Sequence, residues 1–148
     1  MKTVLQRVSE AEVVVDGQVI SSIGRGFLVL LGVTAADKEA QAEALAEKIA
    51  KLRVFPDESG KSNLSITDIE GEILIVSQFT LYADTRKGNR PGFTDAAPPE
   101  MANALYEYFI EYCKGRFKKV GSGSFGADMK VRLVNDGPYT IVMETSSV

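Results

Sequence analysis

The sequence predicts a single α/β domain in which two helices cover one side of a β-rich core. Segments rich in β-branched residues occupy both ends and the middle of the chain, and two segments with helical spacing of apolar residues lie between them. Two helices are too few to cover both faces of so much sheet, so we expect a layered β/β/α arrangement with the order βββ-α-β-α-βββ. The length of 148 residues fits one domain over residues 1–148.

Three strands are expected near the start of the chain. Residues 4–15 are rich in valine, and Asp16-Gly17 follows as a hairpin turn signal, because glycine tolerates a positive φ. Residues 19–23 form the expected return strand. Residues 27–31 are uniformly apolar, which is typical of a strand covered on both faces.

The first helix is expected over residues 37–53, with Asp37 as its N-cap and Pro56 beyond its end. Its apolar positions at helical spacing are Ala42, Leu45, Ile49 and Leu52. A polar loop over residues 57–63 and a strand over residues 73–82 are expected to follow.

The second helix is expected to begin at Pro98-Pro99 and to end before Gly115, because proline is tolerated in a first helical turn and glycine is a common stop. Its predicted apolar stripe consists of Met101, Leu105, Tyr108, Phe109 and Tyr112. The remaining strands are expected over residues 117–120, 130–134 and 140–145, joined by glycine-rich turns.

The composition excludes several kinds of active site. The chain has no histidine, which removes the usual general base and the most common metal ligand, and its single cysteine, Cys113, allows no disulfide within the chain. We therefore expect no metal and no cofactor. The net charge of −3 argues against a protein that coats nucleic acid, but it allows contact with the tip of a tRNA. No apolar segment suits a membrane span or a signal peptide, so we expect a cytoplasmic protein.

Ser77-Gln78-Phe79-Thr80 ends an apolar strand and is the first candidate site. In a strand, Ser77 and Phe79 face one way, and Gln78 and Thr80 face the other. One interpretation is that these polar residues mark a strand leaving the core. The other is the rim of a site that offers two hydroxyls, an amide and backbone N–H groups, although no base is near in sequence to activate either hydroxyl.

Three other segments have both a structural and a functional interpretation. Residues 135–140 have ideal turn chemistry and contain Gly137-Pro138. Two basic segments suit either phosphate contact or a solvated surface: residues 86–90 with Phe93, and residues 114–119. The glycine-rich residues 121–129 contain Phe125, which is either a stacking platform for a base or a loop anchor.

Together these motifs resemble the D-aminoacyl-tRNA deacylase family, also named D-tyrosyl-tRNA deacylase, over essentially the whole chain. The resemblance rests on residues 77–80, on Gly137-Pro138 followed by Thr140, and on the segments 86–91 and 125–129. It implies hydrolysis of the ester bond of D-aminoacyl-tRNA, and of mischarged glycyl-tRNA, at the tRNA acceptor end. It also implies a homodimer with active sites at the subunit interface.

The resemblance implies roles for several residues. Gly137-Pro138 is expected to be a cis peptide that enters the partner's site, where its carbonyls bind the α-amino group and exclude an L side chain. Arg7 is expected to support this motif. Phe125 and Met129 are expected near the terminal adenosine, and Ala102 is expected to line the pocket.

Two residues depart from the family pattern. Tyr139 stands where the family usually has a small or aliphatic residue, and Gly92 stands where it usually has serine. The first departure concerns the packing around Gly137-Pro138, and the second concerns the stiffness of the basic loop.

A site without histidine can still hydrolyse an aminoacyl ester, because such esters are already activated. We expect Ser77, Gln78, Phe79 and Thr80 to form the catalytic segment, with the N–H groups near Phe79 and Thr80 as an oxyanion hole and the vicinal ribose hydroxyl orienting the water. Thr80 as a covalent nucleophile ranks second, because nothing in the sequence can deprotonate it. Two other functions stay open: a non-catalytic RNA-end binding protein, and an acyl hydrolase that uses Thr80 or Ser77 on a small ester.

Overall fold

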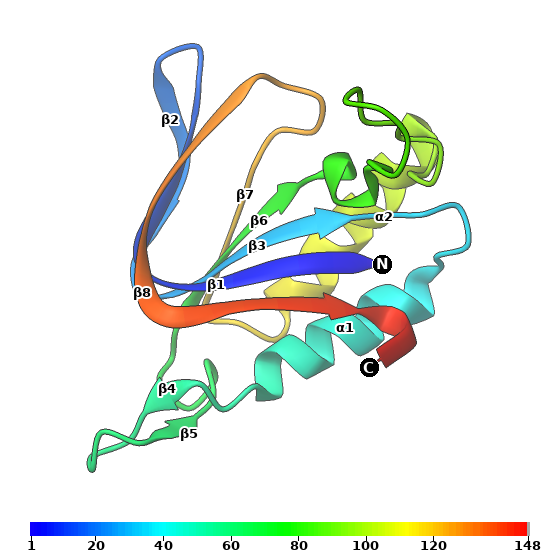
Figure 1. The fold of residues 1–148 in the computed structure, drawn as a ribbon. Coiled ribbons are helices and arrows are strands. Elements are labelled where there is room, and N and C mark those ends of the chain that lie inside the picture. Colours follow the sequence, from blue (N-terminus) through cyan, green and yellow to red (C-terminus); the bar gives the residue numbers. More distant parts are fainter. Residues whose placement is uncertain (148) are drawn as a thin grey trace.

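The computed structural model describes residues 1–147, and their main feature is a curled six-stranded sheet with two α-helices packed against it (Figure 1). The strands of this sheet are β1 (Lys2–Val15), β2 (Gln18–Ile23), β3 (Gly26–Gly32), β6 (Glu72–Ser77), β7 (Lys119–Ser122) and β8 (Met129–Glu144). A small second sheet pairs β4 (Phe55–Pro56) with β5 (Ser62–Leu64). The α-helices are α1 (Glu39–Lys51) and α2 (Pro99–Lys114), and the 3₁₀ helices are η1 (Phe79–Tyr82) and η2 (Thr145–Ser147).

The strand β1 is the centre of the large sheet, because it pairs with three other strands. Its first part, from Lys2 to Val8, pairs with β3, and its last part, from Ala11 to Val15, pairs with β2. Its other edge pairs with β8. Beyond β3 the sheet continues in parallel through β6 and β7, which gives the order β2-β1-β3-β6-β7 with β8 on β1.

The curl of the sheet creates two separate cores. The helices α1 and α2 lie on one face and bury apolar side chains against it (Figure 1). The inside of the curl buries a second cluster, which contains Val8, Ala11, Val13, Ile23, Leu28, Leu74 and Val76. The α/β fold class with helices on one side is therefore confirmed, and the two β layers are two parts of one sheet.

The strand predicted over residues 73–82 is wrong at its end. β6 stops at Ser77 and η1 begins at Phe79, so the predicted alternation of side chains over residues 77–80 does not apply. The N–H of Gln78 donates to the carbonyl of Leu31 at 2.8 Å, and the N–H of Leu81 turns back to the carbonyl of Gln78 at 3.2 Å. The chain therefore leaves the sheet as a helical turn rather than as a strand.

The strands predicted over residues 130–134 and 140–145 are parts of a single strand, β8. The predicted turn at residues 135–139 is an excursion within that strand, because β1 pairs with β8 on both sides of it. The predicted polar loop over residues 57–63 is likewise wrong in part, since it contains the turn and the start of β5 in the β4–β5 hairpin.

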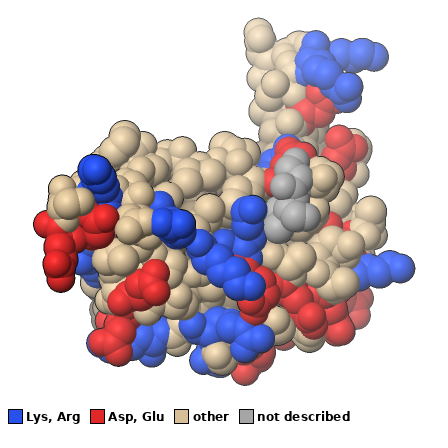
Figure 2. Space-filling view, turned by 90° about the horizontal axis from the view of Figure 1, so that it is seen from below, with Lys and Arg blue, Asp and Glu red and all other residues tan. Residues whose placement is uncertain are grey.

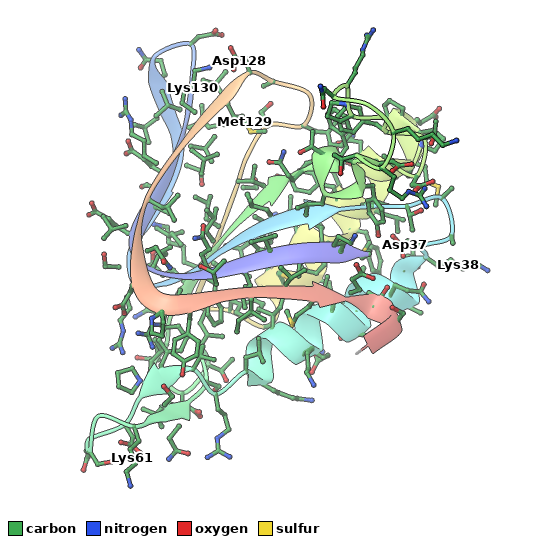
Figure 3. The ribbon with its side chains drawn as sticks, viewed as in Figure 1. Asp37, Lys38, Lys61, Asp128, Met129 and Lys130 are labelled. Carbon is green, nitrogen blue, oxygen red and sulfur yellow. The ribbon has the colours of Figure 1, made fainter. Side chains whose placement is uncertain are left out.

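The first helix begins later than predicted. Lys38 is its N-cap, and the N–H of Lys38 donates to Oε1 of Gln41 at 2.9 Å. Asp37, the predicted N-cap, instead accepts a hydrogen bond from the N–H of Thr34 at 2.8 Å and pairs with the ammonium group of Met1. Figure 3 shows Asp37 and Lys38 next to each other at the start of this helix.

The second helix has the predicted start and end, and of its predicted apolar stripe Leu105 and Phe109 are buried. Its buried residues are Ala102, Leu105, Tyr106, Phe109 and Cys113. Tyr108 and Tyr112, which were predicted in the apolar stripe, are only partly buried, and their hydroxyls donate to Glu43 and Glu47 of α1. None of the helices within residues 1–147 has the length and apolar composition of a membrane span.

The absence of a side chain at Gly26 allows β3 and β6 to pair closely at their first residues. A Cβ atom on Gly26 would lie 1.7 Å from the carbonyl oxygen of Glu72, its partner in the ladder. We expect Gly26→Ala to lower the free energy of unfolding by about 3 kcal/mol or more, measured by urea denaturation, because backbone atoms would have to move apart. Gly92→Ala is the matched control: a Cβ there meets no atom within 4 Å, and its effect should stay within about 0.5 kcal/mol. Equal stability of the two variants would contradict this account.

Candidate functional site

A cavity of about 790 Å³ lies where β6 ends, and it brings together most of the predicted site residues. Of the residues predicted from the sequence, those that line it are Ser77, Gln78, Phe79, Ala102, Phe125 and Met129. The first residues of α2 and the segment that leads into β8 complete its walls. A volume of this size is typical of a small-molecule site.

The position of the cavity follows from the parallel strands. β3, β6 and β7 run in the same direction, so their carboxyl ends share one edge of the sheet. Ser77 ends β6 and Ser122 ends β7, and the backbone leaves the sheet after each of these residues. Open α/β sheets bind ligands outside the carboxyl ends of their strands, so this edge is the expected place for a site.

Tyr106 of α2 holds the wall that carries Phe125. Its hydroxyl lies 2.9 Å from the carbonyl oxygen of Ile75 and 3.1 Å from that of Gly123, and it donates to them. Its ring centroid lies 6.1 Å from that of Phe125. Burial raises the pKa of Tyr106 to about 12, so the hydroxyl stays protonated and remains a donor. Sequence reasoning missed this residue, and the signal was its place on the buried stripe between Ala102 and Phe109.

The side chain of Met129 has room beside the cavity because the nearby residue Gly123 has no side chain. A Cβ on Gly123 would lie 2.6 Å from Sδ of Met129. Figure 3 shows Asp128, Met129 and Lys130 together at the turn that leads into β8. Asp128 is the one ionisable side chain among the described lining residues, and its carboxylate lies 2.7 Å from Nζ of Lys130.

Thr80 lies beside the cavity rather than in its lining. It is exposed in η1, and Nε2 of Gln78 donates a hydrogen bond to its hydroxyl oxygen. A donor to this oxygen ties up a lone pair and does nothing to remove the proton, so the contact does not activate Thr80 as a nucleophile.

Two exposed aromatic rings stand at the mouth of the cavity. The side chains of Phe79 and Phe93 are 54% and 38% exposed, and their ring centroids are 5.1 Å apart in an edge-to-face arrangement. Phe93 follows the basic loop, whose ends are held by hydrogen bonds of 2.8 and 2.9 Å between the backbones of Asp84 and Gly92. Sequence reasoning placed Phe93 with this loop but did not assign it to the rim of the site.

The basic residues have different surroundings in the two predicted runs. In the loop at the mouth, Arg86 pairs with Asp84 at 2.8 Å, and Lys87 and Arg90 are exposed. In the second run, Lys114 pairs with Glu111, Arg116 with Glu47, and Lys119 with Glu72. The second run begins at the C-terminal end of α2, whereas the cavity lies at the N-terminal end of this helix, roughly 20 Å away along its axis. Figure 2 shows basic and acidic side chains interspersed on one face of the molecule.

Arg7, Gly137 and Pro138 form a second cluster that does not line this cavity. The peptide bond between Gly137 and Pro138 is cis, as expected, and both residues are exposed. Arg7 is buried, and its guanidinium donates to the carbonyl oxygens of Asp136 at 3.0 Å and Gly137 at 3.2 Å. The structure therefore divides the predicted residues between the cavity and the cluster around Arg7, with Thr80 in neither group.

No metal-binding group is found among the described residues. Within residues 1–147, no three His, Cys, Asp or Glu side chains are arranged to hold an ion. Cys113 lies buried on α2, where burial raises the pKa of its thiol to about 12 and keeps it protonated.

Comparison with known proteins gives one consistent result. Residues 4–144 match the family model described as D-Tyr-tRNA(Tyr) deacylase. The chain is 58% identical over 146 residues to a D-aminoacyl-tRNA deacylase of Roseiflexus castenholzii, which covers 99% of this chain and 93% of that protein. It is 53% identical over 148 residues to a D-aminoacyl-tRNA deacylase of Thermotoga petrophila, and the match covers 100% of this chain and 99% of that protein.

A solved structure has the same fold as this chain. The structure named c-Myc DNA Unwinding Element Binding Protein superimposes with a TM-score of 0.92 and 47% identity, and covers 97% of this chain and 98% of that one. The family indicated by the sequence motifs is thus confirmed by a model that spans most of the chain and by relatives of high identity. The chain belongs to the D-Tyr-tRNA(Tyr) deacylase family.

Proposed function

We propose that this protein hydrolyses the ester bond of D-aminoacyl-tRNA and releases the free D-amino acid and the tRNA. The observation that carries the proposal is the cavity at the carboxyl edge of the parallel strands, where Ser77, Gln78 and Phe79 lie with Phe125 and Met129. The names of the relatives support the same reaction.

The chemistry requires water, a polarised ester and little else. Water adds to the carbonyl carbon, the bond to the ribose oxygen breaks, and that oxygen leaves with a proton as a tRNA hydroxyl. The N–H groups of Phe79 and Thr80 are our candidates to stabilise the charge on the carbonyl oxygen, because the first N–H groups of a helix have no partner within it. The vicinal ribose hydroxyl orients the water in place of a protein base.

Chirality is assigned to Gly137 and Pro138 of a second subunit. If carbonyls of this segment bind the α-amino group and the oxyanion hole holds the ester, two substituents on Cα remain free. One configuration points its side chain outward and the other points it into the Gly137-Pro138 backbone. Glycine has no side chain to clash, so glycyl-tRNA is also proposed as a substrate. Exclusion of this kind needs no contact with the accepted side chain.

A homodimer is supported by the free edge of β8. Among the described strands, β8 pairs with β1 alone, so one edge of this 16-residue strand has no β partner. Val134 and Val142 on this strand are 50% and 64% exposed. Long edges with exposed apolar side chains favour association unless they are covered. A second copy is the proposed cover, and a monomer in sedimentation at micromolar concentration would contradict it.

Contact with the tRNA acceptor end is assigned to the mouth of the cavity. Lys87 and Arg90 suit phosphate contacts, and Phe125 suits stacking on the terminal base. We propose no DNA partner, although the name of one relative refers to DNA, because the net charge is −3 and acidic side chains interrupt the basic ones (Figure 2). A cytoplasmic location, one domain over residues 1–148 and the absence of a cofactor belong to the same proposal.

The direct test is deacylation of three substrates: D-tyrosyl-tRNA, glycyl-tRNA and L-tyrosyl-tRNA. We expect the first two to release their amino acid, and the third to react at least about 100-fold more slowly, a ratio that corresponds to about 2.7 kcal/mol. Binding of all three without release would support the RNA-end binding protein instead. Equal hydrolysis of a simple aminoacyl ester without tRNA would support the small-ester hydrolase.

Thr80→Ala separates the two mechanisms. If backbone donors and the ribose hydroxyl do the chemistry, the variant should keep its single-turnover rate within about 10-fold, whereas a 2′-deoxy substrate should lose about 100-fold or more. The reason is that a threonine hydroxyl is a poor nucleophile without a base. An inactive Thr80→Ala enzyme with an active 2′-deoxy substrate would assign the attack to Thr80.

A further inference from the structure

The excursion in β8 is unusually long for a sheet irregularity, and it lies opposite one residue. The ladder pairs Gln6 with Thr140 and then Val8 with Asn135, so residues 136–139 of β8 stand against Arg7 of β1. An ordinary bulge places two residues opposite one. The carbonyls of the excursion therefore need partners other than the β ladder.

Side chains of the flanking strands meet part of this need. Arg7 donates to the carbonyl oxygens of Asp136 and Gly137, and its Nε also lies 3.2 Å from the carboxylate of Asp136. Nδ2 of Asn135 donates to the carbonyl of Arg7 at 3.0 Å and to that of Tyr139 at 3.2 Å. The shape of the excursion thus depends on where the Arg7 guanidinium is held.

The guanidinium belongs to an alternating series of cations and aromatic rings. The Cζ atom of Arg7 lies 4.7 Å from the ring centroid of Tyr139 and 6.0 Å from that of Phe55. The Phe55 ring in turn lies 5.5 Å from Cζ of Arg25. Stacking of a planar guanidinium on aromatic faces restrains its orientation. A lysine in place of the arginine, or a small side chain in place of the ring, would give no such restraint.

Tyr139 also ties the excursion to the β4–β5 hairpin. Its hydroxyl donates to Oγ of Ser62 on β5 at 2.6 Å. The hairpin is anchored at its own base, where Nε of Arg53 donates to the carbonyl of Asn63 at 2.8 Å. Arg7 donates as well to the carbonyl of Val54, just before β4. Figure 1 shows this hairpin projecting from the body beside the bend of β8.

We infer that Tyr139 is a positioning residue for Gly137 and Pro138, which it holds in place by stacking on Arg7 and by its hydrogen bond to Ser62. The inference rests on the proposed function, because it gives Tyr139 a share in the discrimination between D and L substrates. A small or aliphatic residue at this position would have neither the flat ring nor the hydroxyl. In this chain the β4–β5 hairpin is therefore part of the support for the chirality filter.

The test compares Tyr139→Phe, Ser62→Ala, the double variant and Tyr139→Val. Tyr139→Phe keeps the stack and removes the hydrogen bond, and Ser62→Ala removes the same bond from its other end. Tyr108→Phe is the matched control. It also removes a hydrogen bond from a tyrosine hydroxyl, but this bond joins α2 to Glu43 of α1. Two quantities are measured: deuterium uptake in residues 134–141, and the ratio of kcat/KM for D-tyrosyl-tRNA to that for L-tyrosyl-tRNA.

We expect Tyr139→Phe and Ser62→Ala each to lower the D/L ratio by about 2- to 10-fold, the effect of one hydrogen bond, and to speed deuterium uptake in the segment. The double variant should lose no more than either single variant, because both remove one bond. Tyr139→Val should lose more, and Tyr108→Phe should change neither quantity.

Two results would overturn the inference: an unchanged D/L ratio and uptake in both conservative variants, or additive losses in the double variant. These results leave the proposed function standing if the parent enzyme still prefers the D substrate. If the parent hydrolyses neither substrate, the proposed function fails, and the exchange measurement still decides whether Tyr139 holds the excursion.

Discussion

The pairing of β1 with three strands is the constraint on which both functional regions depend. One edge of β1 holds β3, and through it the parallel strands whose carboxyl ends form the cavity. The other edge holds both halves of β8, so the residues between them have no place in the ladder and project from it. Backbone N–H and C=O groups that lose their ladder partners must find others. Arg7, which lies on β1 itself, donates to two of these carbonyl oxygens, those of Asp136 and Gly137.

The cavity and the Arg7 cluster have different kinds of support. The cavity is built where regular elements end, and its walls are held by apolar packing and by the neutral hydroxyl of Tyr106. The Arg7 cluster is built where a strand is interrupted, and charge-assisted hydrogen bonds and stacked rings hold it. A site that combines the two, as the proposed dimer would, joins an apolar pocket to a segment of polar backbone that Arg7 holds.

The proposed chemistry depends on fixed donors rather than on titrating groups. The chain has no histidine, and Asp128, the acid in the described lining, pairs with Lys130. Tyr106 stays neutral, because burial raises its pKa to about 12. Donors that are already oriented need no reorganisation when charge develops on a substrate oxygen, which is the condition under which backbone N–H groups contribute most. A substrate that brings its own hydroxyl suits such a site.

The sequence by itself determined the fold class, the family and most of the predicted residues that line the cavity. Periodicity located both helices and most strands, because a buried stripe or an alternating face is a local property of the chain. It failed at Thr80, where a helical turn replaced the end of a strand, and at residues 135–139, where ideal turn chemistry lies inside a continuous strand. Turn signals describe the local backbone and contain no information on which strand pairs with the residues on either side. The contacts of Tyr106 with Gly123 and of Tyr139 with Arg7 and Ser62 were decided only by the tertiary structure, because they join residues far apart in the chain that sheet pairing and helix packing bring together.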